Sequence, residues 1–348
     1  MGEIAQFCKD YALDFSLESP SLFMHGATGL GKTHLSLAIA NEAIARGAYE
    51  AGVHLVSSYP GTPSTEITEC MATYPAEDVF VEWAPNEKVA AEVAIGASIA
   101  GGRAMTCCKH VGLNVMADPL FTNSYTGVHG GMVYCVADDP GMHSSQNEQD
   151  SRHYARAAKI PMLEPSDSLE CRDFTKAAFD LSEEFDTPIL VRLSTRVSHS
   201  QSLVELGERE VHPVKEYQKN IAKYVMMPAN AIKRHVVVEE RTAKVEAFAG
   251  DCSFNTVEDN GSDIGVISAG IAYQYAKEAL GDKVNYLKLG LVWPLSKKLL
   301  KDFAAKCKTV YVIEELDPFI EDACRAMGID VKGKELFSML GEYTPSMI

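Results

Sequence analysis

Short apolar runs alternate along most of the chain with longer stretches whose apolar residues recur at helical spacing. Apolar runs that end in turns with Gly or Pro predict strands, and the stretches between them predict helices. Strands that alternate with helices indicate an α/β fold, with a parallel sheet covered by helices. The predicted strands are 21–25, 53–58, 79–82, 103–107, 132–137 and 188–193, and the predicted helices are 32–51, 63–73, 87–100 and 169–184.

A second pattern of the same kind begins at Asp263, after a charged stretch that contains Pro213 and Pro228. Three strand–helix units predict a smaller parallel-sheet domain. Its strands are 264–268, 284–289 and 309–313, and its helices 272–280, 296–305 and 319–327. The predicted organisation is an N-terminal segment 1–40, a first domain 41–197, a connector 198–262 and a second domain 263–348.

The composition favours a globular protein and argues against nucleic-acid-binding, membrane and iron–sulfur proteins. Hydrophobic residues make up 46% of the chain, which favours a packed core, and the net charge of -16 argues against a general nucleic-acid or anionic-membrane surface. No apolar run approaches the ~20 residues of a membrane span, and no export signal opens the chain. We therefore expect a cytoplasmic protein. None of the nine cysteines forms a CxxC pair, so we expect free thiols and no iron–sulfur cluster on this chain.

A phosphate-loop motif lies near the N-terminus, with Gly26, Gly31, Lys32 and Thr33 in the order GxxxxGK[ST]. In such loops backbone N–H groups hold phosphates, the lysine neutralises them and the threonine binds magnesium. The stretch 11–40 resembles bacterial helicase-loader ATPases, but the resemblance ends near Asn41. We therefore interpret the loop as a vestigial graft; a Gly-rich turn and a working P-loop ATPase are the alternatives.

The rest of the chain, 41–348, resembles the alpha subunit of indolepyruvate:ferredoxin oxidoreductase, C-terminally truncated. Stretches that carry the resemblance occur in the family order: "NEAIARGAYEAGV", "SYPGTPSTEI", "KHVGLNVMADPL", "DDPGMHSSQNEQDSRHYA", "ISAGIAYQYAKEAL" and "VIEELDPFIE". The resemblance implies a first domain that binds the pyrimidine end of thiamine diphosphate and a second, transketolase-C-like domain.

That family's activity is the coenzyme A-dependent oxidative decarboxylation of indolepyruvate and other aryl pyruvates, with electrons passed to ferredoxin. The resemblance also implies a beta subunit, an oligomer, and magnesium and [4Fe-4S] clusters on domains that have no match here. We therefore expect the isolated chain to be inactive. A non-catalytic subunit that completes a site with another chain is a further hypothesis.

The resemblance assigns the acid–base role toward thiamine to Glu87, in an Asn-Glu turn that opens a predicted helix. A carboxyl group at that place holds a proton against N1' of the aminopyrimidine. The residues alone leave another interpretation open, in which Glu87 only complements the helix dipole.

The resemblance also implies that a second turn borders the cofactor and the substrate. Tyr59, Pro60, Gly61 and Thr62 follow the strand 53–58, and Thr62 can also cap the next helix, with Pro63 at its first position.

Lys109, His110 and Asn114 follow the strand 103–107, where ligands collect in parallel sheets. Lys109 and His110 can hold the 2-oxoacid carboxylate or steer protons; the alternative is a surface loop. Pyruvate-using relatives place an arginine after the strand that matches 132–137. This chain has Asp138 and Asp139 there, which favours an aryl pyruvate. We predict no chemistry for His143, Glu148 and Asp150.

Overall fold

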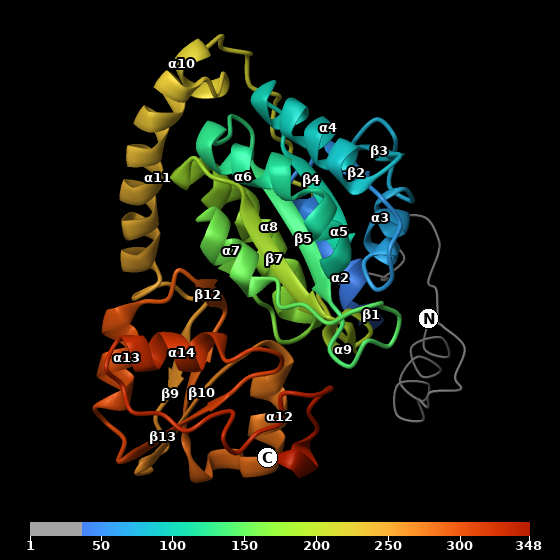
Figure 1. Cartoon of the computed structure of the whole chain (residues 1–348). Coiled ribbons are helices and arrows are strands. Elements are labelled where there is room, and N and C mark those ends of the chain that lie inside the picture. The colour runs from blue at the N-terminus through green and yellow to red at the C-terminus, as the bar shows by residue number, and fades with distance from the viewer. Residues whose placement is uncertain (1–36) are drawn as a thin grey trace, which may run out of the picture.

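The computed structural model describes residues 37–348, which form two larger sheets with their helices and a two-stranded sheet (Figure 1). The phosphate loop with Gly26, Gly31, Lys32 and Thr33 lies outside the described residues, as does the predicted strand 21–25. The predicted α/β class is confirmed, with one sheet in each part of the chain.

The larger sheet has seven strands in the order β12-β6-β7-β5-β4-β2-β3. Every neighbouring pair is parallel except β12 with β6. All seven residues of the central strand β5 are buried, as the nearly continuous apolar sequence requires for a strand covered on both faces. The strands are β2 (Leu55–Ser58), β3 (Phe80–Trp83), β4 (Ala104–Lys109), β5 (Met132–Asp138), β6 (Met162–Leu163), β7 (Ile189–Ser194) and β12 (Leu291–Trp293).

Helices cover both faces of this sheet, with a hydrophobic core on each side. Ile44, Ile67 and Phe179 belong to one core, whereas Leu113 and Leu120 belong to the other. The helices are α2 (Ala40–Glu50), α3 (Thr65–Met71), α4 (Glu87–Ile99), α5 (His110–Val115), α6 (Ala117–Thr126), α7 (Arg152–Ala158), α8 (Ser168–Phe185) and α9 (Thr195–Ser198).

The smaller sheet has the order β13-β10-β11-β9, and its core continues into that of the larger sheet. The antiparallel edge strand β9 comes from the predicted connector, while β12 of the second part joins the larger sheet. Its elements are β9 (Thr256–Glu258), β10 (Ile264–Ala269), α12 (Gly270–Leu280), η2 (Gly281–Lys283), β11 (Asn285–Leu289), α13 (Lys297–Ala304), β13 (Thr309–Ile313), α14 (Phe319–Ala326) and η3 (Pro345–Met347).

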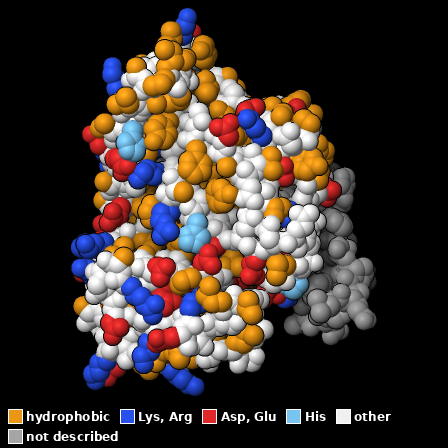
Figure 2. Space-filling view, viewed as in Figure 1, with side chains coloured by type: hydrophobic (Ala, Val, Ile, Leu, Met, Phe, Trp, Pro, Cys, Tyr) orange, Lys and Arg blue, Asp and Glu red, His pale blue; other side chains and the backbone are white. Residues whose placement is uncertain are grey.

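The connector is not irregular throughout. It contains α10 (Ile221–Tyr224) and the 21-residue helix α11 (Pro228–Phe248), which runs along the outside of the molecule toward the second sheet (Figure 1). Hydrophobic side chains gather on the surface over α10 and the start of α11 (Figure 2). The three buried side chains of α11 are too few to give an apolar pattern readable in the sequence.

Two predicted helix starts were wrong. Leu37–Ile39 forms β1, which pairs antiparallel with β8 (Gln201–Leu203), so the predicted continuous helix 32–51 is interrupted and α2 begins at Ala40. Helix α3 begins only at Thr65, with Ser64 rather than Thr62 at the N-cap position. The Gly61 N–H donates to Thr65 Oγ1 (2.8 Å) and Ser64 Oγ donates to the Gly61 carbonyl (2.8 Å), which keeps Thr62 and Pro63 in the turn.

Candidate functional site

Three neighbouring strands bring most of the predicted site residues to one edge of the larger sheet. Strands β4, β2 and β3 are adjacent and parallel, so the turns after Ser58, Trp83 and Lys109 lie side by side. In open α/β sheets this carboxyl edge is where ligands bind. We call the residues in these turns, Tyr59, Pro60, Gly61, Thr62, Glu87, Lys109 and His110, the strand-end site.

Glu87 is the first residue of α4, and Asn86 caps the helix by accepting a hydrogen bond from the Val89 N–H (3.0 Å). Its carboxylate lies over Gly112 of α5: a Cβ at Gly112 would stand 2.5 Å from Glu87 Oε1. The carboxylate is half-buried, and no hydrogen bond or ion pair reaches it from residues 37–348. Glu87 is therefore available to a ligand with an N–H donor.

Lys109 connects the strand-end site to the loop that follows β5. Its aliphatic stem packs over Gly61, where a Cβ would stand 3.1 Å from Lys109 Cδ. Its Nζ donates to the Ser144 carbonyl (2.9 Å), and Ser144 Oγ donates to the Thr62 carbonyl (3.3 Å). The predicted pair of Lys109 and the turn 59–62 is thus brought together, and the Tyr59 side chain remains 41% exposed beside it.

His110 is the first residue of α5 and is buried, so the alternative of a surface loop is wrong for it. Its Nε2 donates to the Asn147 carbonyl (2.9 Å), and its Nδ1 has no partner. Asn114, one turn later, accepts a hydrogen bond from the Tyr154 hydroxyl. Both side chains therefore hold neighbouring segments of the chain.

Asp138 and Asp139 have structural partners that the sequence did not reveal. Asp138 pairs with Arg192 Nε (2.7 Å). Asp139 accepts hydrogen bonds from Ser144 N–H (2.9 Å) and Ser145 Oγ (2.6 Å). Burial alone would raise the pKa of Asp139, but these hydrogen bonds outweigh burial and hold the pKa below its ordinary value. Asp139 thus shapes the loop that carries Ser144 and Asn147.

A buried ion network between the two sheets was missed altogether. Asp150, predicted to lie in a polar loop without a role, receives Arg152 Nε at 2.9 Å, and Arg152 Nη1 reaches Glu314 at 2.6 Å. Arg192 joins the network through Glu164 (2.6 Å). Burial raises the pKa of Asp150, yet the two guanidinium groups hold it well below its ordinary value. We call the domain joint the set Asp138, Asp150, Arg152, Glu164, Arg192, Glu314 and Glu315.

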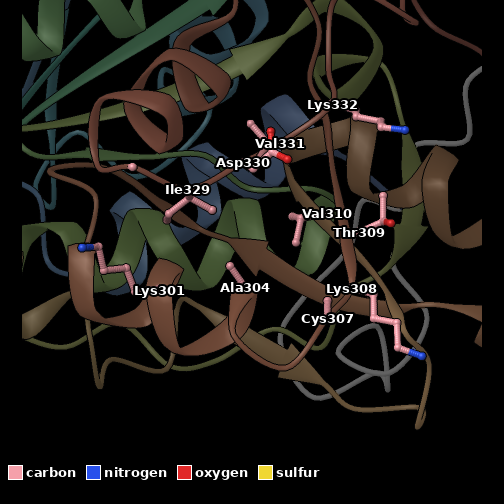
Figure 3. A pocket seen from close by; sticks show the side chains of 11 residues that line it. Lys301, Ala304, Cys307, Lys308, Thr309, Val310, Ile329, Asp330, Val331 and Lys332 are labelled. Atoms are coloured by element: carbon pink, nitrogen blue, oxygen red, sulfur yellow. The ribbon is translucent and has the colours of Figure 1, made fainter.

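One groove lies away from these residues. It has a volume of about 470 Å³ and runs between α13 and the segment 328–332 of the second domain. Figure 3 shows that the Lys301 side chain at its rim points to one side, whereas Lys308 and Lys332 extend to the other side at separate places. Because the three ammonium groups do not converge on one point, we do not interpret the groove as an anion-binding site.

Comparison with known proteins identifies the relatives of this fold. Residues 46–263 match the family described as pyruvate flavodoxin/ferredoxin oxidoreductase, thiamine diphosphate-binding. The chain is 45% identical over 318 residues to indolepyruvate oxidoreductase subunit IorA of Archaeoglobus fulgidus, covering 88% of this chain and 50% of that protein. The corresponding subunit of Thermococcus kodakarensis is 41% identical over 326 residues, with the same shares covered.

A solved structure shares the fold. It is the 2-oxoglutarate:ferredoxin oxidoreductase from Magnetococcus marinus with 2-oxoglutarate, coenzyme A and succinyl-CoA bound, with a TM-score of 0.75 and 21% identity over 99% of this chain and 69% of that chain. The present chain spans about half the length of the curated relatives it matches. These matches lend no support to the helicase-loader resemblance of 11–40. Among residues 37–348, no helix is long and apolar enough to span a membrane.

Proposed function

Since this chain belongs to the thiamine diphosphate-binding family of pyruvate flavodoxin/ferredoxin oxidoreductases, we propose that it supplies the pyrimidine-binding side of a 2-oxoacid:ferredoxin oxidoreductase. The observation that carries the proposal is Glu87, a half-buried carboxylate without a protein partner at the carboxyl edge of a parallel sheet. When bound, thiamine diphosphate supplies a carbon nucleophile for the substrate carbonyl and takes up the charge left by decarboxylation.

Glu87 fits the aminopyrimidine because the ring presents a nitrogen that must share a proton with a carboxyl group. Glu87 is the first residue of α4, so its carboxyl group lies at the positive end of the helix dipole. Because Gly112 has no side chain, the Glu87 carboxylate can lie directly over its backbone. The role we assign to Glu87 is to hold a proton against N1'. The turn of Tyr59, Pro60, Gly61 and Thr62 borders the same ligand.

Lys109 is the group we assign to the 2-oxoacid carboxylate. Its ammonium has a single partner, the Ser144 carbonyl, in an exposed position, so it can exchange that bond for a charged ligand. His110 is buried, and its bond to Asn147 assigns it to holding the loop rather than to direct contact with the carboxylate. We assign Asn114 to the substrate region because it lies on α5, one turn after His110.

The substrate class we propose is the aryl pyruvates, with indolepyruvate as the first candidate. The names of the relatives at 41–45% identity support this class. So do Asp138 and Asp139, where pyruvate-using relatives place an arginine: both are engaged within the protein. Coenzyme A, ferredoxin, a beta subunit, magnesium and [4Fe-4S] clusters belong to the proposal through the family, and we place none of them on the described residues.

The isolated chain is expected to bind thiamine diphosphate weakly and to be inactive. In the family, the diphosphate and its magnesium are held by another domain, and these charge-assisted contacts supply much of the affinity. Calorimetric titration of the chain tests this directly. A dissociation constant in or below the micromolar range for the chain alone would contradict it.

The activity is tested by reconstitution. The chain is mixed with a beta subunit and the diphosphate-binding domain of a relative, and ferredoxin reduction is followed with coenzyme A. We expect turnover with indolepyruvate and at least about tenfold lower kcat/KM with pyruvate. The Glu87→Gln chain serves as the control that links turnover to this site. Equal rates with pyruvate would refute the substrate class.

A further inference from the structure

A small void lies between the two domains at the joint. Its volume is about 10 Å³, close to that of one water-sized sphere. The walls come from both sheets: Arg152, Glu164 and Arg192 from the first, Glu314 and Glu315 from the second. Polar groups thus surround a space that admits at most one water.

Glu164 lines this void with an unsatisfied oxygen. The residue follows β6 and is only 8% exposed. Its Oε1 binds Arg192 Nη1 at 2.6 Å, whereas its Oε2 has no hydrogen-bond partner among residues 37–348. A Cβ at Gly270 would stand 2.4 Å from Oε1, so the carboxylate lies directly against the backbone of the second domain. A buried carboxylate oxygen of this kind requires a donor.

Glu315 faces the same void from the second domain. It follows β13, and its Oε1 accepts a hydrogen bond from the Tyr343 N–H (2.8 Å). Burial raises the pKa of Glu315 to about 7, against the opposing effects of the Tyr343 N–H and of Arg192. A carboxyl group that keeps its proton near neutral pH is also a hydrogen-bond donor.

The charges around the void explain why a proton is needed there. Asp138, Asp150, Glu314 and Glu164 itself share the guanidinium groups of Arg152 and Arg192, which leaves more carboxylates than guanidinium groups at the joint. Glu164 and Glu315 would therefore repel each other if both were ionised in this low-dielectric space. The other charged or titratable groups that face Glu315 are Arg196 on α9, Tyr275 on α12, and Lys334, Glu342 and Tyr343 near the C-terminal end of the described chain.

We propose that Glu164 and Glu315 share one proton across this void, directly or through a single water, and that the two domains are joined tightly only while this proton is present. The proton satisfies the free oxygen of Glu164 and removes the repulsion between the two carboxylates. The association of the two domains at the joint thus depends on pH.

The direction of the pH effect follows from the pKa of Glu315. In the closed joint the proton is retained up to a pH of about 7, whereas a separated glutamate loses it at the ordinary value of 4.5. The closed joint is therefore most favoured below 4.5 and is progressively disfavoured as the pH rises from there through about 7. The ion pairs of Asp150 titrate far below this window, because the pKa of Asp150 is depressed.

Hydrogen exchange of joint amides in the full chain tests this pH dependence. The Ile320 and Glu321 N–H groups donate to Glu314, and the Tyr343 N–H donates to Glu315. After correction for the intrinsic base-catalysed rate, we expect their exchange to accelerate about tenfold between about pH 6 and about pH 8.5. Amides of β2, which is separated by β4 from the nearest strand that contributes to the joint, are the internal reference.

The matched variant is Glu315→Gln. Its amide is neutral at every pH and can still donate to Glu164 Oε2, so the acceleration should disappear while the joint stays closed. An unchanged acceleration in Glu315→Gln would overturn the proposal.

Infrared titration of the unmodified chain provides a test that does not depend on the variant folding. A protonated-carboxyl signal should be present at about pH 6 and lost with a midpoint near 7, and it should shift on labelling glutamate with carbon-13. Absence of a titrating carboxyl signal in this range would equally overturn the proposal.

Discussion

The strand-end site around Glu87 and the domain joint around Arg152 both place charged side chains at the carboxyl ends of parallel strands. In the joint, Arg152 is fully buried and is bound by Asp150, Glu314 and two backbone carbonyls. At the strand-end site, Glu87 is half-buried and receives no hydrogen bond from the described residues. A charged side chain whose bonding groups are bound within the protein, as at Arg152, has a structural role, whereas one without such partners, as at Glu87, is available to a ligand.

The largest effect is expected from breaking the joint with Arg152→Met. The substitution leaves Asp150 and Glu314 buried without their cation, which typically costs about 3–5 kcal/mol in the free energy of unfolding. Urea denaturation measures it. The control is Arg196→Met. The Arg196 side chain is 57% exposed, and loss of its ion pair with Glu342 should cost at most about 1 kcal/mol in the free energy of unfolding. Equal costs for the two variants would refute the distinction between joint and surface pairs.

The next effect concerns the position of Glu87 and uses Gly112→Ala. The new methyl group would stand 2.5 Å from Glu87 Oε1, so the carboxylate must move. In the reconstituted enzyme we expect kcat/KM to fall by about 10²-fold, the usual cost of misplacing a catalytic group by an ångström.

Gly96→Ala on α4 is the matched control for Gly112→Ala. A Cβ at Gly96 meets no atom within 4 Å, so this change should leave activity intact and stabilise the helix by about 0.5–1 kcal/mol. Activity that survives in Gly112→Ala as well would show that the position of Glu87 is not critical.

A smaller effect separates substrate binding from loop anchoring at Lys109. Lys109→Met keeps an apolar stem over Gly61 but removes the ammonium. If Lys109 binds the substrate carboxylate, KM for indolepyruvate should rise about tenfold while kcat changes little. The control is Lys88→Met, which removes an exposed ammonium on α4 that pairs with Asp118. An unchanged KM in Lys109→Met would show that Lys109 does not bind the substrate carboxylate and only holds the loop through Ser144.

The smallest effect is expected at Glu183, which lies outside the strand-end site and the domain joint and makes the stability of the fold depend on pH in acid. Burial raises the pKa of Glu183, but hydrogen bonds from Arg103 and Lys215 outweigh it and lower the pKa to about 2. Glu183 therefore stabilises the fold above its ordinary pKa of 4.5, and this contribution is lost as the pH falls through about 2. Thermal unfolding across this range should show a shallower acid slope in Glu183→Gln. An identical slope would contradict this assignment.

The sequence predicted local features much better than contacts between distant residues. The strands predicted at 132–137 and 309–313 are observed as Met132–Asp138 and Thr309–Ile313, because long apolar runs between turn residues specify buried strands. The start of α4 at Glu87 was also predicted, because an Asn before the first helical residue is a local capping signal.

The joint had no such local signal. Arg152 and Glu314 are 162 positions apart, and neither the charge pattern nor the spacing reveals that they pair. Helix α11 was missed for a related reason, since most of its surface is solvent-exposed and polar. The roles of Lys109 and His110 in holding the loop depend on Ser144 and Asn147, which only the fold brings within reach.

The proposed acid–base role of Glu87 toward the thiamine ring is tested by the rate at which the cofactor's C2 proton exchanges with solvent. In the reconstituted enzyme, Glu87→Gln should leave cofactor binding largely intact, because an amide fills the same space. It should slow C2 proton exchange by about 10²–10⁴-fold, since an amide cannot share a proton with N1' as a carboxyl group does. Exchange within about threefold of the parent rate, measured by proton NMR, would contradict the account and leave Glu87 as a helix-end acid.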